Sequence, residues 1–396
     1  MIENRNNLKQ KEVELKIESD QKIYACWLDT IYWLSGKAKY KLLAAAKTTQ
    51  GIYDMSEEQI TAAVGKKACE RFVQHKRRYK PQKVWNYVTG IGISYTYCRE
   101  PDFPQKLADI PDPPFGVFYK GKLPDAHIPA VALIGSRKCS EYGRHMAEKF
   151  AAEFAAGGVN VISGMALGID GISQRAALKA GGSSYAVLGC GVDIVYPKSN
   201  ELLYRLLQEN GGVLSEYPPQ MEPRPALFPA RNRIISAFAD AVIVVEACEK
   251  SGTLITVDMA LEQGKEVYAV PGRCTDALSM GCNRLLRQGA SIAVSADDII
   301  FDMHWEKTKA GRENSDKKFQ GGNQTERKIG ITEAAKEVCA VLDSLPLSQE
   351  EIVIRLREKK CMITVAQICQ GLVELELNGI VVSQNRQYRL LESVIR

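Results

Sequence analysis

The sequence has 396 residues, of which 45% are hydrophobic and 25% charged, the proportions of a globular protein with two or three domains. Its formal net charge is only +5, and the charge is uneven: residues 1–96 carry seventeen basic and ten acidic side chains, whereas residues 131–304 carry sixteen and nineteen. Eleven cysteines without a CxxC pair, and no apolar run near the ~20 residues of a membrane span, predict a cytoplasmic protein without disulfides, signal peptide or membrane segment.

Helical spacing dominates residues 25–88, where short apolar runs of helical period are separated by glycines. Ser56 and Gln59 form a capping-box pattern at the start of one run. We expect residues 1–96 to form a small helical domain of the SAM or helix-hairpin-helix type. The basic cluster at residues 76–80 has two interpretations, a solvated helix face or a phosphate contact.

Repeated proline marks the segment that follows. Residues 97–124 contain six prolines, which forbid a long helix. Within this segment, Phe115–Lys120 alternates in a strand-like way. We therefore expect it to add a strand to the edge of the following sheet.

Strand and helix patterns then alternate from residue 130 to residue 300. Seven short apolar runs are separated by stretches of helical period. This alternation predicts an α/β fold with a doubly wound, mainly parallel sheet, which we assign to a domain at residues 97–304. The predicted strands are Val131–Ile134, Val159–Ser163, Tyr185–Leu188, Gly212–Ser215, Ala241–Glu246, Glu266–Val270 and Ser291–Val294.

The last part of the chain changes composition twice. Residues 305–332 are polar, charged and rich in glycine and asparagine, which predicts a flexible linker. Residues 333–396 show three helical runs, two of them opened by capping boxes at Ser348 and Thr364, and then a hairpin, which predicts a winged-helix-like domain. The third helix is acidic and would be repelled by phosphate. This favours a structural or protein-binding role, although basic residues on the second helix leave duplex binding open.

The turns after the predicted strands do not match nucleotide-binding motifs. The first turn reads GSRKCSEYG rather than G-x-G-x-x-G, no acidic residue follows the second strand to hold a ribose, and there is no Walker sequence. None of the four histidines lies in a strand-end turn, so Ser136 and Ser163 lack a general base and are better explained as turn or cap serines. We therefore expect no catalytic residue, cofactor or metal.

The first three strand-end turns suit phosphate better. Gly135–Arg137 combines backbone amides, a hydroxyl and a guanidinium at the expected entrance of a helix, whose positive end would face the same point. Ser163–Asp170 repeats this arrangement with free amides, although Asp170 is favoured as a helix N-cap. The third turn adds Lys198 near the same edge.

The fourth turn, Phe228–Arg233, adds an aromatic ring to two arginines and an asparagine. Pro229 suits the first turn of a helix, which leaves Phe228 at the end of the preceding loop. Unpaired bases stack on aromatic rings while their backbone follows positive charge, so this combination suits single-stranded nucleic acid. The alternative places Phe228 in the core and uses the arginines to bridge acidic loops. A fifth turn, Ser251–Thr253, offers hydroxyls and amides before another helix.

Together these motifs resemble those of the DprA/Smf family of bacterial DNA-processing proteins, from about Tyr97 to Asp298. The motifs are GSR at 135–137, SGMALGIDGISQRAAL, GCGVDIVYPKSN, LSEYPP, FPARNRIISAFAD, VVEACEKSGTLITVDMALEQGKEVYAVPG and GCNRLLRQGA. The resemblance implies an extended Rossmann-like domain that binds and protects single-stranded DNA without sequence preference, a homodimer, and loading of the RecA recombinase during natural transformation. The two terminal domains match the family in pattern only.

Carried over residue by residue, the resemblance places a nucleic-acid site on several of the turns described above. The residues that it implies are Gly135, Ser136, Arg137, Lys198, Phe228, Arg231, Asn232 and Arg233, with Gly252 and Thr253 nearby. The amides of the second turn add Ser163 and Gly164 to the predicted site.

An enzyme is the competing interpretation. Ser251–Thr253 is similar to part of the Gly-Gly-x-Gly-Thr turn of nucleotide phosphoribohydrolases, which have a related sheet. However, Glu249 and Lys250 stand where that motif has glycines, and no acid follows closely enough to match the catalytic glutamate. These departures favour a DNA-binding protein over a nucleotide-phosphate hydrolase.

Overall fold

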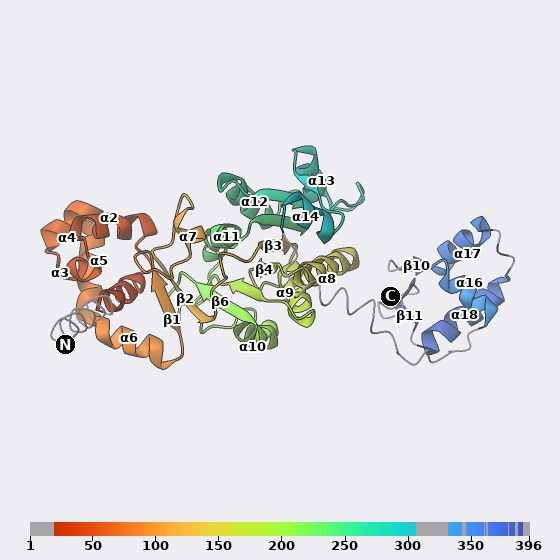
Figure 1. The fold of residues 1–396 in the computed structure, drawn as a ribbon, viewed down its shortest axis with the longest axis horizontal. Coiled ribbons are helices and arrows are strands. Elements are labelled where there is room, and N and C mark those ends of the chain that lie inside the picture. Colours follow the sequence, from red (N-terminus) through yellow and green to blue (C-terminus); the bar gives the residue numbers. More distant parts are fainter. Residues whose placement is uncertain are drawn as a thin grey trace, which may run out of the picture. The chain divides into compact units, whose positions relative to one another are not determined.

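The computed structural model describes residues 20–305, 332–342, 346–359, 361, 363–378, 380–384 and 387–390. The chain divides into two compact units, Met1–Lys317 and Lys318–Arg396 (Figure 1). The predicted linker at 305–332 lies, apart from its two end residues, outside the described residues. No helix in the described ranges is long and apolar enough to cross a membrane.

The first unit is built on a nine-stranded sheet of order β1-β2-β6-β5-β4-β3-β7-β8-β9. β3 to β9 run parallel, whereas β2 pairs antiparallel with both β1 and β6. All seven predicted strands are confirmed, and so is the strand added beside them, which is β2; the outermost strand on that side is β1, which the sequence analysis does not predict. The strands are β1 (Ser94–Tyr97), β2 (Gly116–Gly121), β3 (Ala130–Gly135), β4 (Asn160–Ser163), β5 (Ser184–Val187), β6 (Gly211–Ser215), β7 (Ala241–Glu246), β8 (Glu266–Ala269) and β9 (Ser291–Ile292).

Helices cover both faces of this sheet, as the doubly wound pattern predicts. Along β3 the side chains alternate: Ala132 and Ile134 enter one apolar cluster, and Val131 and Leu133 enter the other. Burial of each such valine, leucine or isoleucine contributes about 1.5–3 kcal/mol. One face is covered by α7 (Gln105–Ala108), α11 (Leu227–Phe238), α12 (Gly252–Glu262) and α13 (Met280–Arg287), and the other by α8 (Glu141–Ala156), α9 (Ile169–Lys179), α10 (Glu201–Glu209) and α14 (Ala296–Asp302).

Short helices precede the sheet and pack against its β1–β2 edge. Residues 20–29 are helical, and the predicted capping box at Ser56 is confirmed. A buried pair, Lys39 Nζ to Asp29 Oδ1 at 2.7 Å, ties these helices to β1, because the Tyr95 hydroxyl donates to the same carboxylate at 2.7 Å. The further helices are α2 (Gly36–Ala46), α3 (Thr49–Asp54), α4 (Glu57–Val64), α5 (Lys66–Arg78) and α6 (Pro81–Gly90).

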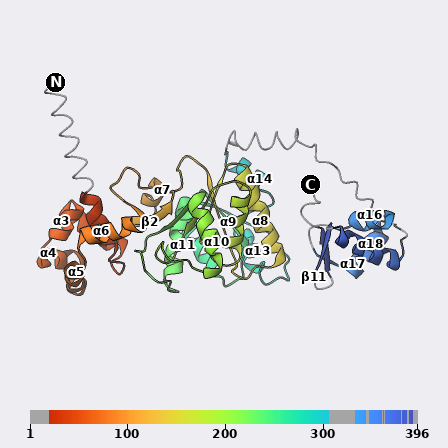
Figure 2. The same ribbon diagram turned by 90° about the horizontal axis from the view of Figure 1, so that it is seen from below.

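In its described residues, the second unit has three helices and a three-stranded antiparallel sheet of order β10-β12-β11 (Figure 2). Both predicted capping boxes, at Ser348 and Thr364, are confirmed. The winged-helix assignment and the division of the first unit near residue 96 stay predictions. The elements are α16 (Glu333–Cys339), β10 (Leu347–Ser348), α17 (Gln349–Glu358), α18 (Val365–Leu377), β11 (Val381–Gln384) and β12 (Gln387–Leu390).

Candidate nucleic-acid interface

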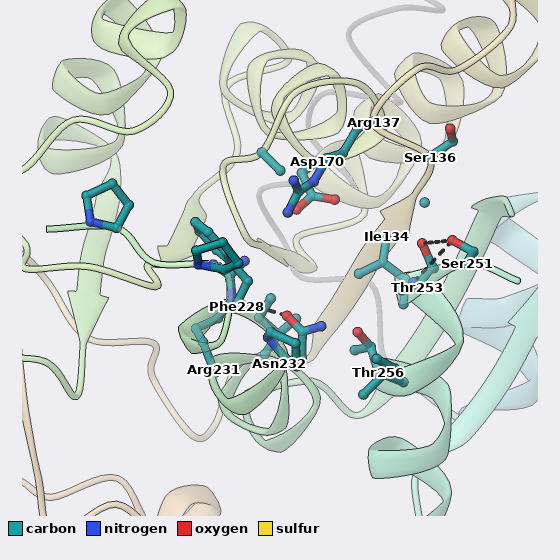
Figure 3. A pocket seen from close by; sticks show the side chains of 18 of the residues that line it. Ile134, Ser136, Arg137, Asp170, Phe228, Arg231, Asn232, Ser251, Thr253 and Thr256 are labelled. Atoms are coloured by element: carbon teal, nitrogen blue, oxygen red, sulfur yellow. Dashed lines mark hydrogen bonds between the residues drawn. The ribbon is translucent and has the colours of Figure 1, made fainter. Parts of the chain in front are cut away.

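A hollow of about 450 Å³ opens at the carboxyl ends of β3 and β7, the point where the strand order of the sheet reverses (Figure 3). Open α/β sheets bind ligands at this position because the loops after neighbouring strands diverge there. We call this hollow the sheet site. Its lining includes Gly135, Ser136, Arg137, Asp170, Tyr196, Phe228, Arg231, Asn232, Gly252 and Thr253.

The first turn of the sheet site is held by contacts within the protein. The Ser136 hydroxyl donates to the Lys138 carbonyl at 3.0 Å and accepts from the Lys138 amide at 3.2 Å. α8 begins only at Glu141, and its N-terminus is capped by Ser140, whose amide and hydroxyl donate to the Glu246 carboxylate. The prediction that the positive end of this helix faces the ligand is therefore wrong, since a protein carboxylate lies there.

The second turn lies directly against the first. Gly168 has φ +72°, and a Cβ on it would lie 2.2 Å from the Ser136 carbonyl oxygen, so glycine is required for this approach. Gly168 is also the N-cap of α9, which means that the N-cap interpretation of Asp170 is wrong. Asp170 lies in the first helical turn and accepts from the Gly164 amide at 3.1 Å. Burial raises the pKa of Asp170, an effect that the nearby Arg231 guanidinium opposes.

Arg231 is a buried positive charge beneath the sheet site, with 4% of its surface exposed. Its Nη1 donates to the carbonyls of Gly164, at 3.1 Å, and of Val187, so it joins the turn that follows β4 to the last residue of β5. Burial lowers the pKa of Arg231 to about 10, which still leaves it protonated at neutral pH. The Asp170 carboxylate acts in the opposite direction and stabilises the charge.

Phe228 forms the aromatic part of the sheet site. α11 begins at Leu227, so Phe228 lies in its first turn rather than in the preceding loop. The Arg137 guanidinium carbon lies 5.4 Å from the centre of the Phe228 ring, and the Tyr196 ring stacks against Phe228 with centroids 5.5 Å apart. A Cβ at Gly189 would lie 2.7 Å from Phe228 Cδ1, so that glycine leaves room for the ring.

Tyr196 is a lining residue that the sequence reasoning missed. It is 42% exposed and lies in the third strand-end turn, two residues before the predicted Lys198. The sequence carries one signal for Tyr196, which is an aromatic residue in a turn at the same edge of the sheet as Phe228. Its stacking on Phe228 depends on a long-range approach that the spacing in the sequence does not show.

The fifth turn completes the wall of the sheet site. α12 begins at Gly252, and the Thr253 amide donates to the capping Ser251 hydroxyl at 3.2 Å. A Cβ at Gly252 would meet no atom within 4 Å, so this helix start is open to a ligand. Gly252 and Thr253 therefore both line the sheet site.

Four of the predicted residues, Ser163, Gly164, Lys198 and Arg233, are not brought into the lining of the sheet site. Ser163 is buried and donates to the Leu133 carbonyl at 2.7 Å, and Lys198 lies exposed outside the hollow. Arg233 pairs with the Glu216 carboxylate at 2.6 Å, as the alternative of arginines bridging acidic loops predicts. Gly164 lines a small adjoining recess of about 50 Å³ together with Arg137 and Phe228.

The chemistry of the sheet site suits a phosphate-bearing ligand with a flat ring. It offers an exposed guanidinium, two stacked aromatic side chains, an open helix start and a buried positive charge. Cys190 lies nearby, but burial raises its pKa to about 12, so its thiol is not a nucleophile. Within the described ranges, no cluster of three or more histidine, cysteine or carboxylate side chains could hold a metal ion.

Comparison with known proteins gives consistent matches. Residues 94–304 match the family described as DNA recombination-mediator protein A. The DNA processing protein DprA of Streptococcus pneumoniae is 41% identical over 203 residues, which are 51% of this chain and 72% of that protein. An X-ray structure of DNA processing protein A from S. pneumoniae matches with a TM-score of 0.63 and 33% identity, covering 71% of this chain and 96% of that one. A Helicobacter pylori structure, described as showing the single-stranded DNA binding mode of its DNA processing protein A, matches at 29% identity and a TM-score of 0.47, covering 53% and 95%.

Proposed function

The chain belongs to the DNA recombination-mediator protein A family, and we propose that its sheet site binds single-stranded DNA without sequence preference. The observation that carries this proposal is the layered arrangement of Arg137, Phe228 and Tyr196 above the buried Arg231. The layer offers aromatic surface to a base and positive charge to the adjoining phosphate.

Two features favour an unpaired strand. Stacking on Tyr196 or Phe228 needs a base face that a duplex keeps covered. Polar side chains of the sheet site are also partly bonded within the protein: the Asn232 side-chain oxygen accepts from Arg231 Nε at 3.2 Å, and the Ser251 hydroxyl donates to that of Thr253 at 3.0 Å. Binding should therefore depend on the backbone and on stacking rather than on sequence.

We infer a binding role rather than catalysis for the same site. Its carboxylate, Asp170, is held by the Gly164 amide and by the charge of Arg231, which leaves it poorly placed to act as a base. Glu249, at a glycine position of the phosphoribohydrolase turn, lies 3.3 Å from Arg284. Incubation with nucleoside monophosphates should release no ribose 5-phosphate. Release of one or more equivalents of ribose 5-phosphate per protein molecule would favour the hydrolase instead.

The wider role follows from the family and is part of the proposal. The protein would act in the cytoplasm as a homodimer, protect incoming single strands during natural transformation, and hand them to a RecA recombinase. The acidic α18 of the second unit suits a protein contact better than a duplex.

Titration of labelled oligonucleotides at several salt concentrations tests the binding proposal. We expect single strands of different sequence to bind alike and the affinity to fall with salt with a slope of about −0.7 per neutralised phosphate. Matched duplexes should bind more weakly. Equal affinity for single strand and duplex would contradict the proposal.

A further inference from the structure

A second hollow, of about 560 Å³, lies between the N-terminal helices and the proline-rich loop that borders the sheet site. We call it the tyrosine site. It is lined by residues from 30–33, from 75–88 in and between α5 and α6, from 218–222, and by Arg224. Pro223 and Pro225 line the sheet site, whereas Arg224 between them lines the tyrosine site. A single stretch of loop therefore separates the two hollows.

Exposed aromatic rings gather in these two hollows. Among the described residues, the exposed large aromatic side chains are Tyr32, Tyr79, Tyr87, Tyr196 and Phe301. The first three, at 46%, 41% and 41% exposure, line the tyrosine site, and Tyr196 lines the sheet site. Such side chains are normally largely buried, so their gathering on one surface marks a ligand-binding area.

Four cations besides a histidine line the tyrosine site. Arg78, Lys80, Lys83 and Arg224 are exposed, and none forms an ion pair within the described part of the chain. Arg224 lies 5.8 Å from the centre of the Tyr32 ring, and Arg78 lies 5.3 Å from that of Tyr79. By contrast, Arg137 is the one exposed cation among the described residues that line the sheet site. The tyrosine site thus offers more positive charge to phosphate than the sheet site does.

The basic side chains at residues 76–80 do not all line the tyrosine site. Lys76 donates to the Tyr53 carbonyl and lies 4.6 Å from the Tyr53 ring centre, away from the hollow. Arg78 and Lys80 line the tyrosine site. Burial lowers the pKa of His75, which also lines it, to about 4, so that ring is neutral at physiological pH. Glu222 is the acidic side chain in the lining.

The wall shared with the sheet site is held in place by polar contacts. The side-chain Nε2 of Gln220 donates to the Tyr87 hydroxyl at 2.6 Å. The backbone amide of Gln220 donates to both carboxylate oxygens of Asp193, at 2.9 and 3.1 Å. The Gly191 amide donates to the Met221 carbonyl at 2.8 Å. These contacts join α6 to the third strand-end turn and hold the tyrosine site open before a ligand binds, which lowers the entropic cost of binding.

We propose that a single DNA strand bound in the sheet site continues across Arg224 into the tyrosine site, where Tyr32 and Tyr87 stack with bases and Lys80 and Lys83 neutralise phosphates. This inference rests on the proposed function, because it extends the same strand. The combination of unpaired cations with exposed aromatic rings is the chemistry of a stacking platform for single strands. A duplex would keep its base faces covered and would gain only the attraction between its phosphates and these cations.

Oligonucleotide length separates the two hollows experimentally. We would titrate the full-length protein and its Lys80→Ala/Lys83→Ala variant with oligothymidylates of about six and about sixteen nucleotides, both within the range of single-strand site sizes. The short strand should bind both proteins within about twofold. The variant should bind the long strand with a salt slope about 1.4 smaller in magnitude, because two phosphate contacts are lost. Raising the salt from 50 to 200 mM should therefore weaken long-strand binding by the wild type about sevenfold more than long-strand binding by the variant.

Matched substitutions control for charge and for stacking. Lys122→Ala/Lys179→Ala removes two exposed lysines that line neither hollow and should leave the long-strand slope unchanged. Tyr32→Ala should weaken binding of the long strand about tenfold. Tyr32→Phe should preserve the affinity, because stacking needs the ring and not the hydroxyl. Far-ultraviolet circular dichroism checks that each variant is folded.

The outcomes distinguish this inference from the proposed function. If the wild type binds neither strand, or if Arg137→Ala changes neither affinity, the proposed function fails. If Arg137→Ala weakens both strands but the Lys80/Lys83 and Tyr32 variants bind the long strand like the wild type, the sheet site stands and the tyrosine site is overturned.

Discussion

The sheet site and the tyrosine site use the same kinds of side chain in opposite ways. In the sheet site the arginine at the centre is buried, and its donors already bind the carbonyls of Gly164 and Val187. In the tyrosine site Lys80, Lys83 and Arg224 are exposed and without ion-pair partners in the described part of the chain. The sheet site therefore offers little unpaired positive charge to a ligand, whereas the tyrosine site offers several unpaired cations.

The difference shows that a cation at a binding site has two separate uses. A buried guanidinium that donates to backbone carbonyls, such as that of Arg231, connects separate segments of the chain, so its removal should affect folding and binding together. An exposed guanidinium or ammonium contributes through phosphate contacts and should affect mainly the salt dependence of binding. The two regions should therefore respond differently to substitution.

The largest expected effect comes from removing the buried charge of the sheet site. Arg231→Ala should lower the free energy of unfolding by about 3–5 kcal/mol, because Asp170 and two carbonyls lose their buried partner. Urea unfolding followed by circular dichroism measures this change. Arg224→Ala, an exposed arginine of the tyrosine site, is the control and should change stability by no more than about 0.5 kcal/mol. Similar losses in the two variants would remove the contrast between the regions.

Next in size is the loss of the aromatic surface. Phe228→Ala should weaken binding of short single strands by about 1–3 kcal/mol if a base stacks on the Phe228–Tyr196 pair. Fluorescence anisotropy with an oligonucleotide of mixed sequence measures this loss. Phe301→Ala removes a 78% exposed ring that lines neither hollow, and its affinity should be that of the wild type. Unchanged affinity in the Phe228 variant would assign that ring to packing alone.

A smaller and more specific effect is expected from the exposed guanidinium of the sheet site. Arg137→Ala should weaken all single strands alike, whatever their sequence, and reduce the magnitude of the salt slope by about 0.7, the value for one phosphate contact. Titrations of several homopolymers across a salt series test both statements. A loss confined to one base type would indicate sequence reading instead of backbone contact.

The effect that is smallest at neutral pH concerns His75 in the tyrosine site and appears only as the pH is lowered. Burial lowers the pKa of His75 to about 4, with Arg78 and Lys39 adding to the shift, so the folded state binds fewer protons than the unfolded chain between about pH 4 and 6.5. The contribution of His75 to stability is therefore present above pH 6.5 and is lost as the pH falls toward 4. In His75→Gln, urea midpoints should depend less on pH across this window. Parallel curves for the two proteins would contradict the assignment.

Much of the fold could be predicted because its determinants are local. Apolar runs such as Val131–Ile134 and capping residues such as Ser56 and Thr364 act within a few residues of the chain, and the sheet and helix starts follow from them. The grouping of strand-end turns into one hollow could also be predicted, since parallel strands end at one edge. Gly135, Arg137, Phe228 and Gly252 accordingly line the sheet site.

The remaining features depend on contacts between distant parts of the sequence. Glu246 fills the start of α8 from 106 residues away, and Glu216 binds Arg233, so two groups expected to meet phosphate meet protein carboxylates instead. The tyrosine site joins α5 and α6 to a loop more than a hundred residues later. Neither the period of the apolar residues nor the spacing of the motifs carries information about such pairings.

Photochemical crosslinking tests the central claim, that single-stranded DNA lies against the stacked rings of the sheet site. A single-stranded oligonucleotide containing iodouracil would be irradiated with the wild-type protein, and the crosslinked peptides identified by mass spectrometry. Crosslinks to Tyr196 or Phe228, reduced in Arg137→Ala, are the predicted result. Efficient crosslinking that maps only to residues outside the sheet site would contradict the account.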